Sequence, residues 1–545
     1  MAPPQPRSRA AEASGEATEA WCRAAEAWRE ADPDPETRAQ IDALVAEADP
    51  EVLEEHFGRR LGFGTAGIRG PLGPGPNRMN LLQVQQVAVA VARHLLATEP
   101  DAARRGVVVG RDARHGSARF AAEVVRVLSI HGLPVHVLDE PVPTPLAVFA
   151  VSELGAAAGV VVTASHNPPT DNGVKVVWSD GAQIVPPVDE GIAAAMAPMP
   201  ADSDANPVPA DEVPGEVHHL GGAGGDHPVV LGYLARAASL IPLRPAHPLR
   251  IATTALHGVG AGLLERVLRA AGHEDLHPVA AQLAPDPDFP TVALPNPEEP
   301  HALDALVALA EERRADVGVA LDPDADRLAV VVPGRHGGWS RLSGDEVGAL
   351  LLWHLLARTA TTPDRLVATT VVSSQLAGKM CGEAGVHFRE TPTGFKWLCR
   401  PGLEHPEWHQ VLLYEEALGY AVGPTARDKD GITAALVVLD LVSELRAASR
   451  TPWDVLDDLA RRFGAHVTLT GSVPRRGGEL APERHELRPD GIRVIVRPSG
   501  TEPKVKYYLE AVAAVPPRQD PESVRTDLRT RLEQVVRELR RELET

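Results

Sequence analysis

The sequence contains no apolar run that approaches the length of about 18 to 20 residues needed for a membrane-spanning helix. Its first residues, Met1 to Pro6, lack the apolar core of a secretory signal. We therefore expect a cytoplasmic protein without a membrane partner. Cysteine is also scarce, and Cys22, Cys381 and Cys399 form no closely spaced pair. This excludes a disulfide framework and gives no support to a cysteine zinc site.

Positive charge is in short supply, because 54 basic residues face 74 acidic ones and leave a net charge of −20. Such a balance repels polyanions and argues against nucleic acid as the main partner. Lysine is rarest, with six lysines beside 48 arginines. A compact ammonium with a tunable pKa does what a guanidinium cannot. The lysines are therefore candidate site residues, at positions 175, 379, 396, 429, 504 and 506.

With 545 residues, 44% apolar and 23% charged, the chain has the composition of an ordinary globular protein of several domains. Residues 1–15 are typical of a loose tail, and 16–56 follow a helical pattern. Strands and helices then alternate, which predicts α/β organisation. Predicted strands are 106–110, 134–138, 156–163, 249–255, 316–321, 328–332, 366–371, 411–414, 467–469, 492–496 and 505–511. Predicted helices are 117–131, 343–356, 431–445 and 521–543, and 198–228 is a linker or surface loop.

Three aspartates alternate in Asp322-Pro323-Asp324-Ala325-Asp326-Arg327, between two predicted strands. Carboxylates at this spacing repel one another unless a cation lies among them, and Mg²⁺ is the hard cation that oxygen ligands suit first. A calcium EF-hand does not fit, because Arg327 and Pro333 stand where that loop needs Gly and Glu. An aspartyl-phosphate phosphatase loop does not fit either, since it needs Thr or Val at Asp326. The segment predicts a magnesium site.

A serine follows the predicted strand 156–163 in Thr163-Ala164-Ser165-His166-Asn167-Pro168, and Asn172-Gly173-Val174-Lys175 comes shortly after. Ser165 at the carboxyl end of a strand suits a nucleophile or a phosphate carrier. The Gly-x-Ser-x-Gly pattern of a hydrolase elbow is absent, and His166 is too near in sequence for an ordinary triad base. From this motif alone, a serine that only caps the turn is an equal alternative.

A third motif, from Arg497 to Lys506, reads Arg-Pro-Ser-Gly-Thr-Glu-Pro-Lys-Val-Lys. Consecutive Ser-Gly-Thr amides and hydroxyls beside Arg497 suit a phosphate dianion. Two further loops are weaker signals: Thr391 to Lys396, and Tyr414 to Tyr420 followed by Arg427 to Gly431. Their adjacent carboxylates could accept hydrogen bonds from vicinal sugar hydroxyls, although Glu-Glu is more often a solvated surface. Five of the six lysines fall within these motifs.

In this order, the serine, aspartate, Glu-Glu and Arg-Pro-Ser-Gly-Thr-Glu-Pro loops resemble the α-D-phosphohexomutase superfamily of phosphoglucomutases and phosphomannomutases. The resemblance runs from about Leu61 to about Leu509. Three further segments resemble the branch that holds phosphoglucomutase-like and phosphopentomutase enzymes: Phe63 to Gly70, Phe289 to Thr291, and Pro295 to Pro300.

The resemblance implies an α/β fold, with three α/β domains of mixed sheets and a smaller C-terminal α+β domain around a central cleft. After an N-terminal tail and helices at 1–56, we expect domains at 57–215, 228–342, 343–464 and 465–545.

The resemblance also implies residue roles. Ser165 would be a phosphoserine, whose oxygen would join Asp322, Asp324 and Asp326 around Mg²⁺. The transferring phosphoryl group would be surrounded by Arg69, His166, Lys175 and Arg327. The sugar would meet Thr393, Gly394, Lys396, Glu415, Arg427 and Lys429. The substrate's other phosphate would bind Arg497, Ser499, Gly500 and Thr501.

The implied reaction moves a phosphoryl group from phosphoserine 165 to a sugar monophosphate and returns the other phosphate to Ser165. The resulting sugar bisphosphate also serves as a catalytic activator. Lys175 is the candidate base, because an Arg cannot give up its proton and a Lys crowded by cations can have a lowered pKa.

The sugar loop departs from the hexomutase pattern Gly-Glu-x-Ser, because it reads Tyr414-Glu415-Glu416-Ala417 and lacks the serine hydroxyl. The leading interpretation is a mutase of hexose 1-phosphate and hexose 6-phosphate, on glucose or mannose. The alternatives are a phosphopentomutase on ribose or deoxyribose phosphate and a sugar 1,6-bisphosphate synthase fed by an acyl phosphate. A non-catalytic regulator is disfavoured because the motifs are intact. Oligomeric state is not encoded in these patterns.

Overall fold

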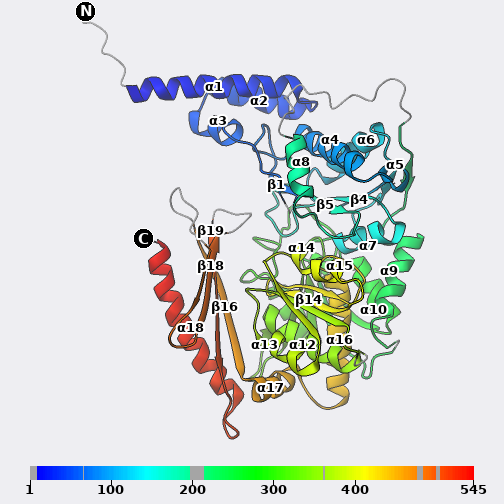
Figure 1. The fold of residues 1–545 in the computed structure, drawn as a ribbon, viewed down its shortest axis with the longest axis vertical. Helices are drawn as coiled ribbons and strands as arrows, with labels where there is room; N and C mark the ends of the chain where they lie inside the picture. Colours follow the sequence, from blue (N-terminus) through cyan, green and yellow to red (C-terminus); the bar gives the residue numbers. More distant parts are fainter. Residues whose placement is uncertain are drawn as a thin grey trace, which may run out of the picture.

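The computed structural model describes residues 9–64, 67–196, 214–242, 244–359, 362–474, 483–498 and 504–544. Ser499, Gly500 and Thr501 of the predicted phosphate loop lie outside these ranges, as do Thr65 and Ala66. Within them, four sheets follow one another along the chain (Figure 1).

The chain begins with three helices: α1 (Arg9–Ala31), α2 (Pro35–Glu47) and α3 (Pro50–Phe57). The predicted tail is therefore too long, because α1 starts at Arg9 in an alanine-rich stretch of high helix propensity. Asp34 and Asp49 cap α2 and α3, each followed by a proline at the first helical position. The predicted helical pattern of 16–56 is found in these helices, and the face of α1 that carries Trp21, Ala25 and Trp28 packs against α2 and α3.

The first sheet has strand order β1-β5-β4-β2-β3-β6. Its strands are β1 (Ile68–Pro71), β2 (Val107–Arg111), β3 (Val135–Val137), β4 (Ala158–Val162), β5 (Asp171–Trp178) and β6 (Val217–His219), and its helices are α4 (Leu81–Thr98), α5 (Ala102–Arg105), α6 (Ser117–Ile130), α7 (Thr144–Leu154) and α8 (Val188–Met196). The sequence did not predict β5, which runs antiparallel to β4 and β1 and makes the sheet mixed. Residues 198–213 of the predicted linker lie outside the described residues, and β6 occupies part of the rest.

The second sheet has strand order β11-β10-β9-β7-β8. Its elements are β7 (Arg250–Thr254), β8 (Asp275–Pro278), β9 (Val317–Leu321), β10 (Leu328–Pro333) and β11 (Trp339–Arg341), with α9 (Pro228–Ala238), α10 (Ala261–Ala270), a 3₁₀ turn (Ala280–Gln282) and α11 (Asp304–Arg313). Leu321 of β9 faces Leu328 of β10 in an antiparallel pair. The aspartate segment is therefore the connection of a hairpin whose strands are buried.

The third sheet has strand order β13-β12-β14-β15. Its elements are β12 (Arg365–Thr370), β13 (His387–Thr391), β14 (His409–Glu415) and β15 (Gly419–Val422), with α12 (Gly344–Arg358), α13 (Leu376–Ala384), α14 (Phe395–Leu398), α15 (Arg400–Glu404), α16 (Gly431–Ala447) and α17 (Pro452–Phe463). The predicted sugar loop connects β14 to β15, so Glu415 ends a buried strand.

The fourth sheet is antiparallel, in the order β16-β19-β18-β17, and packs against one long helix. Its elements are β16 (Ala465–Pro474), β17 (Arg484–Leu487), β18 (Arg493–Pro498), β19 (Lys504–Ala513) and α18 (Pro521–Glu544). In Figure 1 this brown and red unit stands beside the third one, just after α17. The predicted class, three α/β units with mixed sheets and a smaller C-terminal α+β unit, is confirmed.

The first three units share a continuous apolar core. Helix α7 packs on α9, and the buried hydroxyl of Tyr233 in α9 donates to the carboxylate of Asp430, the N-cap of α16, at 2.8 Å. The three cysteines are free thiols, and Cys381 and Cys399 are buried. In the described part of the chain, no helix combines the length and apolarity needed to cross a membrane.

Candidate active site

The predicted serine and aspartate loops meet, although more than 150 residues separate them in sequence. Ser165 Oγ lies 3.1 Å from Asp322 Oδ2 and donates to it, and both residues are buried. The nearer ring nitrogen of His166, Nδ1, is 3.2 Å from the same hydroxyl. The two motifs therefore form one site at the contact between the first and second units.

Arg114 holds the serine loop in place. Its guanidinium donates to the backbone carbonyls of Ser165, Asn167 and Pro168, each at 2.6 Å. Ser165 has a positive φ of 54°, a conformation that costs a non-glycine residue of the order of 1 kcal/mol or more. Sequence reasoning missed Arg114, just beyond the end of β2, because its role depends on contacts with a loop about 50 residues further along the chain.

The three aspartates form a buried cluster with a ligand oxygen of each within 4.8 Å of the others. Oδ1 of Asp324 and Oδ1 of Asp326 are buried and have no hydrogen-bond partner in the described chain. Burial and the two neighbouring carboxylates raise the pKa of Asp322 well above its usual range. Unsatisfied, mutually repelling carboxylate oxygens are the donor set that a hard divalent cation takes, so these residues fit Mg²⁺.

Two lysines from other elements reach this cluster. Lys175 Nζ in β5 lies 2.6 Å from Asp324 and 2.8 Å from Asp326, and Lys429 Nζ lies 3.2 Å from Asp326. Thr144, at the start of α7, donates its hydroxyl to Asp324 at 2.7 Å. Thr144 was also missed by sequence reasoning, because only the packing of α7 on the aspartate loop gives it a role.

The protonation of Lys175 differs from the sequence-based expectation. Burial works to lower its pKa, but the carboxylates of Asp324 and Asp326 outweigh burial, and the pKa is raised. The ammonium is therefore stabilised in this arrangement, whereas the expected base needs a lowered pKa. By contrast, burial and the charges of Arg327 and Arg69 lower the pKa of His166 well below its usual range. A neutral imidazole then stands beside the serine hydroxyl.

Arg327 and Arg69 supply the fixed positive charge. The backbone N–H of Arg327 donates to Asp322 at 2.9 Å, and its guanidinium pairs with Glu298 at 2.8 Å. Arg69 in β1 stands opposite Gly173 of β5. Nε of each arginine is buried without a partner among the described residues. These donors suit the oxygens of a transferring phosphoryl group.

Several residues predicted to bind the sugar lie near one another in the third unit, and one of them, Lys429, contacts the aspartate cluster. The charges of Glu415 and Lys429 both act on Lys396, whose pKa burial lowers to about 8. Lys396 follows Thr393 and Gly394, and Gly394 needs its φ of 111° to begin α14. Arg427 instead donates to the backbone carbonyl of Asp180, where the first and third units touch. Its side chain serves this contact in the structure.

Glu416 is the second of the two adjacent carboxylates expected to accept from sugar hydroxyls, and in the structure it contacts protein hydroxyls. Burial and the neighbouring Glu415 raise its pKa to about 8. Its carboxylate accepts from the hydroxyls of Thr370 at 3.2 Å and Ser373 at 3.5 Å. Ala417, the next residue, leaves the loop without the serine hydroxyl of the hexomutase pattern.

The predicted distal phosphate loop is described up to Pro498 and from Lys504. Arg497 Nη2 lies 3.4 Å from the hydroxyl of Tyr508, with the guanidinium 5.7 Å from the ring centroid. Its Nε is buried and has no hydrogen-bond partner among the residues that the structure describes. Lys506 is paired with Arg497 in the β18–β19 register. Burial lowers the pKa of Lys506, against the opposing charge of Glu298. A charge of the second unit therefore acts on a lysine of the fourth.

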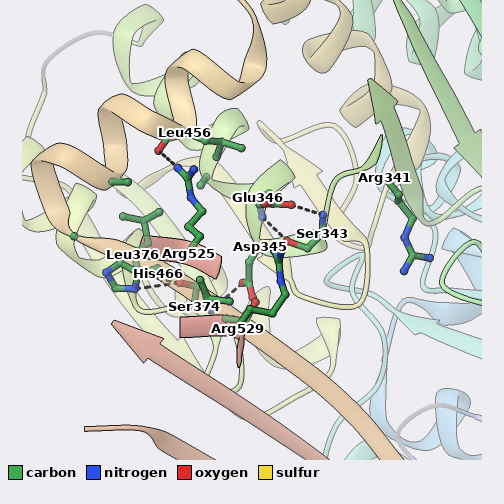
Figure 2. A pocket seen from close by; sticks show the side chains of 15 residues that line it. Arg341, Ser343, Asp345, Glu346, Ser374, Leu376, Leu456, His466, Arg525 and Arg529 are labelled. Carbon is green, nitrogen blue, oxygen red and sulfur yellow. Dashed lines mark hydrogen bonds between the residues drawn. The ribbon is translucent and has the colours of Figure 1, made fainter. Parts of the chain in front are cut away.

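A cavity of about 220 Å³ lies away from Ser165, where the third and fourth units join (Figure 2). Its lining includes Asp345, Ser374, His466 and Arg525. Ser374 donates its N–H to Asp345 at 2.8 Å and its hydroxyl to Glu510 at 2.7 Å. Because Ser373 contacts Glu416, this polar network ties the fourth sheet to the sugar loop.

The fold and the site together fit an enzyme that transfers phosphoryl groups. Comparison with known families places the chain more closely. The models for phosphoglucomutase/phosphomannomutase α/β/α domains I, II and III match residues 60–200, 232–337 and 343–463, and the model for the C-terminal domain of these enzymes matches 483–515. The chain belongs to the phosphoglucomutase/phosphomannomutase family, within the α-D-phosphohexomutase superfamily, and is a phosphosugar mutase of the isomerase class.

Individual relatives cover most of the chain. A Schizosaccharomyces pombe protein named "Probable phosphoribomutase" is 37% identical, over 88% of this chain and 92% of its own. A Haemophilus influenzae protein named "Probable phosphomannomutase" is 36% identical, over 79% of this chain and 93% of its own. The structure of a phosphoglucomutase/phosphomannomutase family protein from Burkholderia thailandensis is 21% identical, covers 86% of this chain and 96% of its own, and superimposes with a TM-score of 0.64. That similarity shows the shared fold.

Proposed function

We propose that this mutase carries its phosphoryl group on Ser165 and interconverts pentose 1-phosphate and pentose 5-phosphate. The observation that carries the mechanism is the 3.1 Å contact of Ser165 Oγ with Asp322 inside the buried aspartate cluster. A hydroxyl in that position can hold a phosphoryl group against a bound cation while arginines and lysines surround its oxygens.

Asp322, Asp324 and Asp326, with an oxygen of phosphorylated Ser165, are the residues that would hold Mg²⁺. When bound, the ion would neutralise charge that develops on the transferring phosphoryl group. Arg327 and Arg69 contribute fixed donors to the same group. Lys175 and Lys429, which contact Asp324 and Asp326, balance the remaining negative charge.

The reaction consists of two opposite transfers. In the first, the bond between Ser165 Oγ and phosphorus breaks, a new bond forms to the free hydroxyl oxygen of the sugar monophosphate, and the hydroxyl proton passes to Ser165 Oγ through a neighbouring base. The sugar bisphosphate then turns over. In the second transfer, Ser165 Oγ takes the other phosphoryl group and its proton returns to the sugar oxygen. Added sugar bisphosphate would act as activator by rephosphorylating an enzyme that has lost its phosphate.

Glu415 would accept hydrogen bonds from the sugar hydroxyls, with Lys396 and Lys429 beside it. Arg497 and the neighbouring Ser499 to Thr501 would hold the phosphate that is not reacting. This distal site must serve the substrate in both of its orientations. It is assembled from a different unit of the fold from the one that carries Ser165.

The preference for pentose reverses the order that the sequence suggested. Its support is the relation to the phosphoribomutase relative and the replacement of the serine hydroxyl by Ala417, which leaves one fewer contact for a six-carbon sugar. Hexose phosphate is the second candidate, supported by the phosphomannomutase relative at nearly equal identity.

The test is a coupled assay of the phosphorylated enzyme with the 1-phosphates of ribose, deoxyribose, glucose and mannose, with only catalytic sugar bisphosphate present. The proposal expects kcat/KM to be highest for a pentose phosphate. A higher value for glucose or mannose would establish the hexose candidate. Activity that consumes an acyl phosphate donor stoichiometrically and releases bisphosphate would instead identify a synthase.

A further inference from the structure

The segment Pro295 to Pro300 supplies none of the site residues predicted from the sequence, yet its Glu298 reaches Arg327. It has no regular secondary structure and precedes α11. Its Glu298 carboxylate contacts the Arg327 guanidinium at 2.8 Å, where the Arg327 side chain is 14% exposed and the Glu298 side chain 39%. A residue far from the serine and aspartate loops in sequence thus binds directly to a guanidinium of the phosphoryl site.

The position of Glu298 is held by its own surroundings. Arg341 at the end of β11 donates to the backbone carbonyls of Pro297 at 2.8 Å and Glu298 at 2.9 Å. The backbone N–H of Glu298 donates to the side-chain oxygen of Asn296 at 3.1 Å. Because the backbone of Glu298 is fixed by these hydrogen bonds, its carboxylate can hold the Arg327 guanidinium in one position.

Arg327 needs such a partner. Its backbone is tied to Asp322 at 2.9 Å, but the long side chain has several rotatable bonds, and Nε is buried without a partner in the described residues. One amino nitrogen is bound by Glu298. Holding one end of a planar guanidinium sets the direction of its other donors. The positive charge of Arg327 acts on His166, because it lowers the pKa of that imidazole together with burial.

We infer that Glu298 is a positioning residue for phosphoryl transfer: it holds the Arg327 guanidinium toward the phosphate on Ser165 in both half-reactions. The inference rests on the proposed function. Glu298 touches no reacting atom and acts through Arg327. Removing its charge leaves Arg327 present but free to rotate, which weakens stabilisation of the transition state more than it weakens ground-state binding.

The experiment compares wild type, Glu298→Gln and the control Glu299→Gln on the sugar phosphate that wild type turns over fastest. Glu299 has the same charge and is the next residue in the segment. We expect Glu298→Gln to lower kcat about tenfold to a hundredfold, as a small misplacement of a catalytic group does. KM should change less than about threefold, and Glu298→Asp should recover part of kcat. Glu299→Gln should match wild type, and all variants should share one melting temperature.

A double-mutant cycle with Arg327→Ala separates positioning from a structural effect. If Glu298 acts through Arg327, then Glu298→Gln on the Arg327→Ala background should cost less than about twofold in single-turnover transfer from phosphorylated Ser165. Equal losses on both backgrounds, or an unchanged kcat in Glu298→Gln, would overturn the inference and leave the mutase proposal intact. Wild-type enzyme that transfers no phosphoryl group from Ser165 to any sugar would overturn both.

Discussion

Arg114 Nη2 donates a hydrogen bond to the backbone carbonyl of Ser165 at 2.6 Å. Two further carbonyls of the same loop are bound by this one guanidinium, which is itself stacked 5.0 Å from the ring centroid of Phe289. A residue of the first unit, braced by the second, thus holds the proposed phosphate carrier in its left-handed conformation.

Arg114→Lys should therefore lower kcat by at least about tenfold, because one ammonium cannot reproduce a planar fork that spans three carbonyls. The melting temperature should also fall, since buried carbonyls lose their partners. Arg119→Lys, on the exposed side of α6, is the matched control and should change neither. A full kcat in Arg114→Lys would show that the loop holds its shape without the clamp.

Ser165→Ala should abolish multiple turnover and leave folding intact, because no other group can carry the phosphate. Intact-mass analysis should find one phosphate on wild type and none on the variant. Thr170→Ala, in the same loop, should keep both phosphate and activity. Residual kcat above about a thousandth of wild type, equivalent to roughly 4 kcal/mol of barrier, would remove Ser165 from the carrier role.

Asp324→Asn should weaken Mg²⁺ binding and activity together, because its buried Oδ1 has no protein partner in the described chain and one of three compensating charges is lost. The Mg²⁺ concentration for half-maximal activity should rise by about tenfold or more. Chelator should abolish wild-type activity and added Mg²⁺ should restore it. Asp304→Asn, at an exposed position of α11, should behave as wild type. Activity that survives chelation would exclude a catalytic metal at this cluster.

Arg497→Ala should lower kcat/KM in both reaction directions by about tenfold to a hundredfold, the value of a charge-assisted contact of roughly 1.5 to 3 kcal/mol. Sugar-free hydrolysis of the phosphorylated enzyme should be unchanged, because Ser165 and the aspartates are untouched. Arg488→Ala in the same unit should have little effect. Loss in one direction only, or a parallel fall in hydrolysis, would place Arg497 at the reacting centre.

Asp345, at the cavity between the third and fourth units, should make stability depend on pH. Burial raises its pKa to about 6, against about 3.9 for an unperturbed aspartate. The folded state thus binds this proton more tightly than the unfolded state, so stability present below about pH 4 is lost as pH rises through 6. Asp345→Asn escapes the loss.

The stability gained by Asp345→Asn over wild type should therefore be larger at pH 8 than at pH 5, by about 1 kcal/mol or a few degrees in melting temperature. The exposed Asp527→Asn is the control and should show no such trend. If the stability difference between Asp345→Asn and wild type does not grow with pH, burial does not raise the pKa of Asp345.

Much of the fold could be predicted from the sequence, because short apolar runs indicate buried strands. Strands β2, β4, β9 and β10 and helix α6 lie within one or two residues of their predicted positions. Strand β5 was missed because Asn172 and Gly173 look like a turn, and its pairing on both sides with β4 and β1 overrides that local preference. Helix α1 begins at Arg9, before the predicted helical pattern, because the alanine-rich stretch ahead of Glu16 has a high helix propensity.

The motifs by themselves indicated the candidate serine, the candidate metal-binding aspartates and the family, because each motif consists of a few consecutive residues. The tertiary structure alone decided what lies between the motifs. Arg114, Thr144 and Glu298 take part through contacts with residues 29 to 180 positions away, which no local pattern records. The same holds for the pKa of Lys175, which sequence expected to fall. Its direction is set by two carboxylates brought within 2.8 Å by folding. Electrostatic energy depends on distance and burial in space, and the sequence specifies neither directly.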